Sequence, residues 1–302
     1  MPQSTISTNR RVSTDMPVAD PGDQGTAPLF LSLSERGNRL GEGGLRTRGL
    51  LKKDHDSKPL VSVVTVVFNG AQHLEETIRS IINQSYDNIE YIIIDGGSTD
   101  GTLDIIKQYD HTIAYWVSEP DSGIYDAMNK GVSLACGDWI NFMNAGDIFS
   151  DETTVQHVFS DIMNYSTYDC IYSDTLFNYR SGSQLITCDI RKRRIIHQSI
   201  IYNKHLHFVA GPYLVAEGVT ISDYLFFMTN RDRKWVKYPL PISTYSPYGR
   251  TSGSDAYKQK IAVDVMFGFT GRVTAAILLV IHPLYHGMKK ICSLGSRGRK
   301  RF

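Results

Sequence analysis

Two carboxylates of this 302-residue chain follow apolar stretches, at positions where a carboxylate can do chemistry. Asp95 comes directly after the stretch 89–94, and Asp147 ends the turn that follows the stretch 138–143. If both stretches are parallel strands, the two side chains project into the crevice beyond the carboxyl ends of the sheet, where open α/β sheets bind ligands. A carboxylate at that edge can hold a divalent cation or accept a proton.

A third carboxylate, Asp223, stands between Ser222 and the apolar residues 224–227. Two interpretations stay open on the local sequence. Ser-Asp before an apolar run is a common helix start, which would make Asp223 a helix cap. A polar side chain at the mouth of an apolar segment also suits a general base, which must reach the proton that it accepts.

Strand and helix patterns alternate along the part of the chain that must position these side chains. Stretches rich in β-branched residues predict four buried strands, at 60–67, 89–94, 113–117 and 138–143. Apolar residues at helical spacing predict covering helices between them, at 74–82, 103–106 and 124–135. This alternation predicts an α/β fold with a mostly parallel central sheet flanked by helices.

Composition narrows the class of protein. A formal net charge of +1 gives no overall attraction to a polyanion, so we expect no nucleic-acid partner. The four cysteines are scattered without a CxxC pair, which indicates isolated thiols in a reducing compartment. Residues 1–28 lack the apolar core of a secretory signal, so we expect a cytoplasmic protein.

Both ends of the chain differ from the domain predicted at 59–255. Residues 1–58 carry one apolar cluster, at 29–33, among polar residues and glycines, and we predict a disordered extension there. Residues 256–302 predict an amphipathic or apolar C-terminal helix and a basic tail. The unbroken apolar run 273–281 is much shorter than the roughly 20 residues of a spanning helix. Two interpretations stay open: the helix lies in an anionic membrane interface, or it packs on the domain.

Five ordered segments carry a family resemblance: PLVSVVTVVFNG, SIINQSY, IEYIIIDGGSTDGT, SEPDSGIYDAMNKG and GDWINFMNAGD. In this order, from about residue 59 to residue 151, they strongly resemble the nucleotide-binding half of the family 2 glycosyltransferases of GT-A fold. The likeness continues more loosely through IIHQSIIY, ISDYLFF and STYSPYGRTSG. These segments look most like bacterial transferases that build colanic-acid-type and other exopolysaccharide repeat units.

The resemblance implies a Rossmann-like GT-A domain that moves a sugar from a nucleotide-diphosphate donor to an acceptor hydroxyl, non-processively and with inversion. Negative charge builds up on the departing diphosphate, so a divalent cation, Mg²⁺ or Mn²⁺, is expected beside it. The expected acceptor is a lipid-linked glycan in exopolysaccharide or cell-surface polysaccharide biosynthesis. The protein would then work at the inner face of the cytoplasmic membrane, through peripheral contact of its C-terminal segment.

Residue roles carried over by position from the family cover both sides of the expected crevice. The resemblance implies contact with the nucleotide sugar for seven residues: Thr65, Val67, Asn69, Asp95, Ser98, Asp121 and Asn144. It implies Asp147 as the metal ligand and Asp223 as the catalytic base. His197 and Gln198 match a segment that lines the acceptor side.

Structural interpretations of three of these residues stay open beside the functional ones. Ser98 suits a helix cap after the turn at 95–101. Asp121 suits a turn-forming aspartate. His197 suits a buried, hydrogen-bonded histidine.

Two departures from the family pattern bear on function. Gly96 stands where many relatives have a second aspartate, and the turn at 144–147, Asn-Ala-Gly-Asp, keeps a single carboxylate. An alternative function is therefore a degenerate glycosyltransferase fold that binds nucleotide, or scaffolds a synthesis complex, without catalysis. A processive synthase is disfavoured, because the sequence lacks a QxxRW segment and several spanning stretches.

Overall fold

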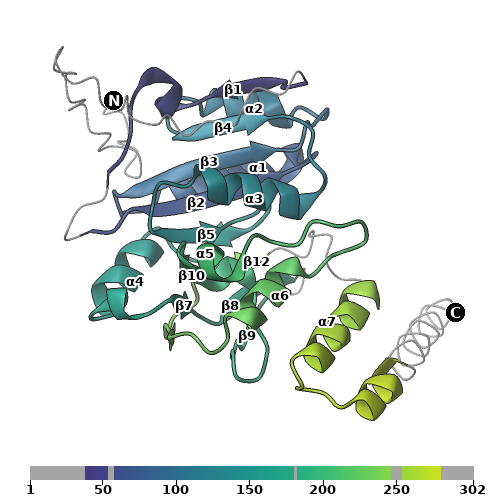
Figure 1. Ribbon diagram of the computed structural model, residues 1–302. Helices are drawn as coiled ribbons and strands as arrows, with labels where there is room; N and C mark the ends of the chain where they lie inside the picture. Colours follow the sequence, from purple (N-terminus) through teal and green to yellow (C-terminus); the bar gives the residue numbers. More distant parts are fainter. Residues whose placement is uncertain (1–37, 54–57, 180–181, 246–253, 280–302) are drawn as a thin grey trace, which may run out of the picture.

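The computed structural model describes residues 38–53, 58–179, 182–245 and 254–279. Within these residues the chain forms an eight-stranded sheet and a smaller four-stranded sheet (Figure 1). The strands of the large sheet, in spatial order, are β1 (Gly41–Gly43), β4 (Tyr115–Ser118), β3 (Ile89–Asp95), β2 (Val61–Val67), β5 (Trp139–Phe142), β10 (Ile200–Asn203), β7 (Cys170–Tyr172) and β11 (Trp235–Lys237). Its four central strands, β4, β3, β2 and β5, are parallel to one another, as predicted.

The carboxyl ends of the central strands meet at one edge because their register aligns them. Val67 at the end of β2 is opposite Asp95 at the end of β3, and Asp95 is opposite Ser118 at the end of β4. Every residue of β2 and β3 is buried, as continuous β-branched sequences predict for strands covered on both faces. The predicted α/β fold is confirmed.

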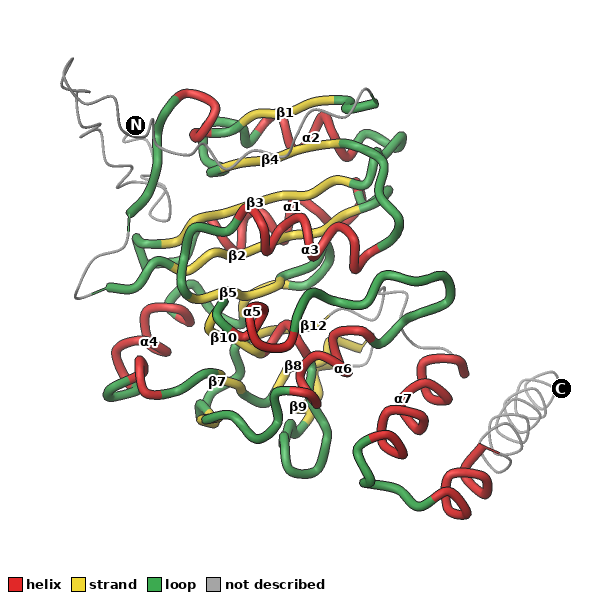
Figure 2. Tube along the Cα trace, in the orientation of Figure 1, coloured by secondary structure: helices red, strands yellow, loops and turns green. Residues whose placement is uncertain are grey.

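Helices cover both faces of the large sheet (Figure 2). One face packs against α1 (Ala71–Ile82), α2 (Thr102–Gln108) and α4 (Thr154–Asp161). The other face packs against α3 (Ile124–Leu134), α5 (Leu206–Ala210) and α6 (Ser222–Thr229). Side-chain alternation along β2 divides the two cores, because Val63 belongs to the first and Val64 to the second. Burial of each such side chain contributes roughly 1.5–3 kcal/mol.

The four-stranded sheet was not predicted, and it supports a turn at the site edge. Its strands, in spatial order, are β6 (Ile148–Phe149), β12 (Ser243–Tyr245), β8 (Thr175–Tyr179) and β9 (Gly182–Ile186). The short 3-10 helix η3 (His197–Ser199) lies against this sheet, where the hydroxyls of Ser199 and Ser243 are 2.6 Å apart. Because β6 directly follows the turn at 144–147, the small sheet holds η3 close to that turn.

Part of the predicted N-terminal extension is ordered and covers the edge of the large sheet. β1 pairs antiparallel with β4, and the 3-10 helix η1 (Leu45–Arg48) follows it. The side chain of Arg46, 1% exposed, forms an ion pair with Glu90 of β3. The prediction of disorder is therefore wrong for residues 38–53, because pairing with the open edge of β4 depends on a distant segment and leaves no local periodicity. Residues 1–37 lie outside the described residues.

The C-terminal helix α7 (Ser254–Met266) packs on the domain, at the end of the molecule opposite β1 (Figure 1). The Tyr224 hydroxyl donates a hydrogen bond to Asp264 at 2.7 Å, and Val263 is buried in the core beneath α6. Of the two open interpretations, packing on the domain therefore applies to α7. The basic tail beyond residue 279 lies outside the described residues. No helix among the described residues has the length and apolarity needed to cross a bilayer.

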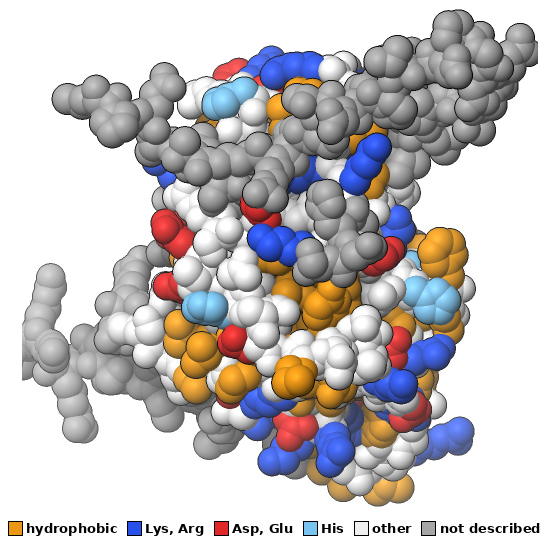
Figure 3. All heavy atoms as spheres, turned by 90° about the vertical axis from the view of Figure 1, so that its left-hand side faces the viewer, with side chains coloured by type: hydrophobic (Ala, Val, Ile, Leu, Met, Phe, Trp, Pro, Cys, Tyr) orange, Lys and Arg blue, Asp and Glu red, His pale blue; other side chains and the backbone are white. Residues whose placement is uncertain are grey.

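Figure 3 shows the face that points to the left in Figure 1, where Lys and Arg side chains are interspersed with Asp and Glu. Charges of both signs are thus mixed among the described residues of this face. Cys136, Cys170 and Cys188 are free thiols, as their scattered positions predict, and Cys292 lies outside the described residues.

Candidate active site

The turn after β3 is built around Asp95. Its carboxylate is fully buried and accepts hydrogen bonds from the Ser98 N–H at 3.1 Å, from the Ser98 hydroxyl and from the Ser118 hydroxyl at 2.5 Å. Gly97, at φ +84°, supplies the left-handed backbone of this turn. Asp95 therefore ties the ends of β3 and β4 together. A ligand in the crevice would meet the turn and not the Asp95 carboxylate, which does not support the predicted direct contact.

Asn69 ties the end of β2 to the same turn. Its N–H donates to the Ser98 hydroxyl at 2.7 Å, and its side-chain oxygen accepts from the Thr99 N–H at 2.9 Å. Asn69 itself is exposed at the sheet edge, where the sequence prediction places it. Ser98 does not cap α2, because the N-cap of that helix is Gly101 and has no side-chain hydrogen bond. Ser98 instead links Asp95 to Asn69.

Thr65 and Val67 lie inside the sheet. The Thr65 hydroxyl is fully buried and donates to the Met143 carbonyl at 2.7 Å. Val67 is 6% exposed, in the core beneath α1. The predicted contacts of these two side chains with a nucleotide are not supported, because helices and neighbouring strands cover β2 up to its last residue.

Asp121, in the loop after β4, lies beside Gly96. A Cβ atom at Gly96 would stand 2.6 Å from Oδ2 of Asp121, so the absent side chain leaves the space that this carboxylate fills. Oδ1 of Asp121 accepts a hydrogen bond from the Gly123 N–H at 2.8 Å. Burial raises the pKa of the Asp121 carboxyl, and the nearby charge of Asp95 adds to the rise. Asp121 is therefore a partly exposed carboxylate beside the turn that contains Gly96.

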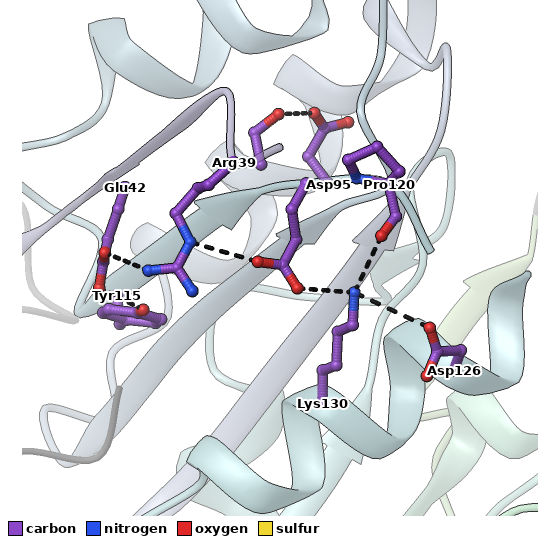
Figure 4. A network of polar contacts seen from close by, with 9 residues as sticks. Arg39, Glu42, Asp95, Tyr115, Pro120, Asp126 and Lys130 are labelled. Carbon is purple, nitrogen blue, oxygen red and sulfur yellow. Dashed lines mark hydrogen bonds and ion pairs between the residues drawn. The ribbon is translucent and has the colours of Figure 1, made fainter. Parts of the chain in front are cut away.

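A buried charge network fixes the loop that carries Asp121 (Figure 4). Glu119, 1% exposed, pairs with Lys130 at 2.9 Å and with Arg39 at 3.2 Å. Lys130 also donates to the Pro120 carbonyl at 3.3 Å. In Figure 4, Lys130 extends from α3 and Arg39 from the N-terminal segment toward the same carboxylate, that of Glu119. Ordering of that segment therefore helps to position this side of the crevice.

The turn after β5, residues 144–147, is held by Thr77 of α1. The Thr77 hydroxyl donates to the Asp147 carbonyl at 2.8 Å and accepts from the Gly146 N–H at 2.9 Å. The Asp147 carboxylate is 5% exposed and accepts a hydrogen bond from the Gln198 side chain at 2.7 Å. Gln198 is itself 3% exposed. Gln198 therefore supports the turn at 144–147, and its burial does not support the predicted contact with an acceptor.

A divalent cation would find few protein ligands at this turn. Among the described residues, no group of three or more His, Cys, Asp or Glu side chains is arranged to hold a metal ion. The Asp147 carboxylate offers hard oxygen, and one of its two oxygens already bonds to Gln198. Mg²⁺ usually keeps several waters and takes one or two carboxylates plus phosphate oxygens. The turn fits a cation that receives most of its ligands from a diphosphate and water.

Asp223 lies in the first turn of α6 and is bound from two sides. Its Oδ2 accepts from Nδ1 of His197 at 2.8 Å, and its Oδ1 accepts from the Tyr125 hydroxyl at 2.8 Å. Burial raises the pKa of this carboxyl, but the hydrogen bonds from His197 and Tyr125 outweigh burial and bring the pKa below its usual value. Its side chain is 21% exposed. The cap interpretation is wrong, because the N-cap of α6 is Ile221.

His197 connects Asp223 to the turn at 144–147. Because a carboxylate only accepts, Nδ1 of His197 carries the proton in the bond to Asp223. Nε2 of His197 then accepts from the Asn144 side-chain amide at 3.0 Å. The amide oxygen of Asn144 is buried and has no hydrogen-bond partner among the described residues. This chain of contacts joins the two sides of the predicted crevice, and it makes Asn144 a candidate ligand-binding residue.

The arrangement can do one kind of chemistry well. A partly exposed carboxylate, kept ionised by two donors, can accept the proton of a hydroxyl that approaches it. The turns after β3 and β5 offer backbone and amide groups beside it for a polar ligand. Tyr125 and Thr77, which hold Asp223 and the 144–147 turn, were missed by sequence reasoning. Both have positions typical of helix residues that face a core, so no local signal identifies them.

The chain matches known glycosyltransferases in sequence. Residues 62–210 match the profile of Glycosyl transferase family 2. The chain is 34% identical over 162 residues to a PGL/p-HBAD biosynthesis glycosyltransferase of Mycobacterium bovis (strain BCG / Pasteur 1173P2). That match covers 51% of this chain and 63% of the relative.

Solved structures share the fold at low sequence identity. Staphylococcus aureus TarS 1–349 in complex with UDP-GlcNAc superposes with a TM-score of 0.57 at 16% identity, over 73% of this chain and 70% of that one. The mannosyltransferase PcManGT from Pyrobaculum calidifontis, in complex with GDP-Man and Mn²⁺, superposes with a TM-score of 0.56 at 15% identity, over 81% and 76%. Residues 62–210 therefore form a glycosyl transferase family 2 domain, and the structural likeness shows a GT-A fold.

Proposed function

We propose that this protein transfers a glycosyl group from a nucleoside-diphosphate sugar to a hydroxyl acceptor, non-processively and with inversion. The observation that carries the proposal is Asp223, a partly exposed carboxylate that His197 and Tyr125 bind at the edge of a family 2 domain. The relative from Mycobacterium bovis is called a glycosyltransferase, and the solved neighbours hold UDP-GlcNAc or GDP-Man.

In the proposed reaction the acceptor hydroxyl attacks the anomeric carbon of the donor sugar. The new bond joins the acceptor oxygen to that carbon, while the bond from the carbon to the diphosphate oxygen breaks. The electron pair leaves with the diphosphate, and the hydroxyl proton passes to Asp223. Attack from the face opposite the leaving group inverts the anomeric configuration. Asn69, Asp121 and Asn144 offer polar groups to the donor beside this path.

A divalent cation, Mg²⁺ or Mn²⁺, is part of the proposal. It would lie at Asp147 and neutralise charge on the diphosphate that leaves. The Mn²⁺ in the complex of the Pyrobaculum mannosyltransferase supports this expectation. Chelation with EDTA should then abolish transfer, and added Mn²⁺ should restore it.

The proposed acceptor is a lipid-linked glycan used in exopolysaccharide or cell-surface polysaccharide biosynthesis. Peripheral contact with the inner face of the cytoplasmic membrane belongs to the same proposal. The side chains of Val273 and Ile277 support it, since they are 76% and 52% exposed one helical turn apart, ahead of the basic residues of the C-terminal sequence. If removal of residues 273–302 leaves the protein bound to anionic vesicles, this membrane contact is wrong.

A donor screen tests the proposed function. Purified protein is mixed with nucleoside diphosphates and their sugars, with and without Mn²⁺, and thermal stabilisation and transfer to acceptor are measured. We expect one nucleotide class to stabilise the fold and one of its sugars to be transferred. Absence of transfer from every donor to lipid-linked and soluble acceptors would contradict catalysis.

A second candidate function is nucleotide binding without catalysis. The structure favours it at one point: the carboxylates of Asp95 and Asp147 are both buried and hydrogen-bonded within the protein, which leaves few ligands for a cation. Stabilisation by a nucleoside diphosphate that is independent of Mn²⁺, together with no sugar transfer, would select this alternative.

A further inference from the structure

Tyr125 lies in the first turn of α3, far from Asp223 in the sequence. Their separation is 98 residues, yet the Tyr125 hydroxyl lies 2.8 Å from Oδ1 of Asp223. The Tyr125 side chain is otherwise buried, at 5% exposure. The packed protein therefore holds the Tyr125 hydroxyl at the carboxylate, and the hydroxyl is not a mobile surface group.

The surroundings of Tyr125 prevent its ring from swinging away. Its ring packs against the ring of Tyr213, with centroids 6.0 Å apart. The Asn129 side chain, one helical turn further along α3, donates to the Tyr213 carbonyl at 2.9 Å and accepts from the Tyr213 N–H at 2.8 Å. The segment at 213 is thus clamped to α3, and it holds the Tyr125 hydroxyl in place. Groups fixed in this way can position a reacting side chain accurately.

We propose that Tyr125 is a positioning residue that, together with His197, holds the Asp223 carboxylate in one orientation for proton transfer. The inference rests on the proposed function and deepens it. A carboxylate bound through one oxygen can still rotate about its Cβ–Cγ bond. Tyr125 binds Oδ1 and His197 binds Oδ2, so both oxygens of Asp223 are fixed. Misplacement of a reacting group by about 1 Å can slow catalysis roughly 100-fold.

The charges around Asp223 agree with this role. Burial and the charge of Asp223 raise the pKa of Tyr125, so its hydroxyl keeps its proton and remains a donor. Tyr213 also feels the charge of Asp223, but its hydroxyl pairs with that of Tyr202 at 3.0 Å. His197 from η3 and Tyr125 from α3 are the side chains that bind the carboxylate directly.

The test compares Tyr125→Phe with Tyr213→Phe, which removes a buried hydroxyl from the same cluster without touching Asp223. For Tyr125→Phe we expect kcat to fall roughly tenfold, because this factor corresponds to the free energy of one hydrogen bond to a charged group. The KM for the donor should stay unchanged. Loss of a donor raises the pKa of Asp223, so the acid limb of the kcat/KM profile should move up by about one pH unit. Tyr213→Phe should leave the acid limb in place.

Two further variants keep the inference testable if Tyr125→Phe folds poorly. 3-Fluorotyrosine at position 125 is a stronger donor, so the acid limb should move to lower pH. His197→Asn keeps an N–H near the place of Nδ1 and should retain more activity than His197→Leu. An unmoved acid limb and unchanged kcat in Tyr125→Phe, in an active wild type that Asp223→Asn inactivates, would overturn the role of Tyr125 alone. A wild type that transfers nothing would overturn the proposed function instead.

Discussion

The two ends of the parallel sheet each hold a carboxylate bound by a basic side chain, and they differ in exposure. At the amino end, Glu90 pairs with Arg46 and accepts from the Ser62 hydroxyl at 2.6 Å. At the carboxyl end, Asp223 accepts from His197 and Tyr125. The side chain of Glu90 is 1% exposed, whereas that of Asp223 is 21% exposed.

This difference separates a structural carboxylate from a chemical one. Glu90 also accepts from the Cys136 N–H at 2.7 Å, and the protein encloses it on every side. It ties the N-terminal segment to β3, and its loss would leave Arg46 as an unpaired buried charge. Asp223 has similar partners but retains an open side, so a hydroxyl can approach it. Exposure, and not the kind of partner, decides which carboxylate can react.

The largest effect should come from Asp223→Asn. The amide has the shape of the carboxylate but accepts no proton, so kcat should fall about 10³-fold. Nucleotide affinity and the thermal midpoint should stay near the wild-type values. Steady-state kinetics and thermal unfolding measure both. Full activity in this variant would show that Asp223 is not the base, and the carboxylates at the two ends would then not differ in role.

At the amino end of the sheet, Arg46→Met should lower the free energy of unfolding by about 3 kcal/mol, because it leaves the buried Glu90 without its cation. Urea unfolding measures the change. The control is Arg48→Met, in the same short helix, where the side chain is 49% exposed and pairs with Asp110. This control should change stability by less than about 0.5 kcal/mol. A loss of kcat without a loss of stability in Arg46→Met would contradict a purely structural role.

His207, in α5, should make the stability of the fold sensitive to acid. Burial lowers the pKa of His207 to about 4, and its Nε2 lies 2.9 Å from the Tyr202 hydroxyl. The folded state therefore holds His207 neutral, while the unfolded chain protonates it near pH 6.5. Its contribution to stability is present above pH 6.5 and is lost as pH falls toward 4, by about 3 kcal/mol. His207→Gln should flatten this part of the stability curve, and an unchanged slope would refute the assignment.

The smallest effect should come from Gly96→Ala at the carboxyl end of the sheet. The new methyl would meet Oδ2 of Asp121, the end of a side chain that can move. We expect the donor KM to rise about threefold with kcat unchanged, since only ground-state binding is disturbed. The matched control is Gly101→Ala, where φ is +96° and no atom of the described residues lies within 4 Å of the new Cβ. It should lower stability by about 1 kcal/mol and leave the donor KM alone.

Sequence patterns predicted well the strands and helices that form the carboxyl end of the sheet. The strands and helices from 60 to 143 follow from local periodicity, and their alternation places the turns that contain Asp95 and Asp147 at one edge. The direction of each side chain within those turns was less predictable. The carboxylates of Asp95 and Asp147 turn inward to Ser98 and Gln198, because burial there required hydrogen-bond partners.

The sequence by itself determined the α/β layering, because a period of 2 or 3.6 in apolar residues records which face is buried. It also placed Asp223 beside an apolar helix, with its role left open. Only the tertiary structure decided that role, since the partners of Asp223 lie 26 and 98 residues away. The same holds for Arg46, whose ion pair orders a segment without periodicity of its own. Contacts between distant residues depend on how strands and loops pack, and local spacing carries no record of them.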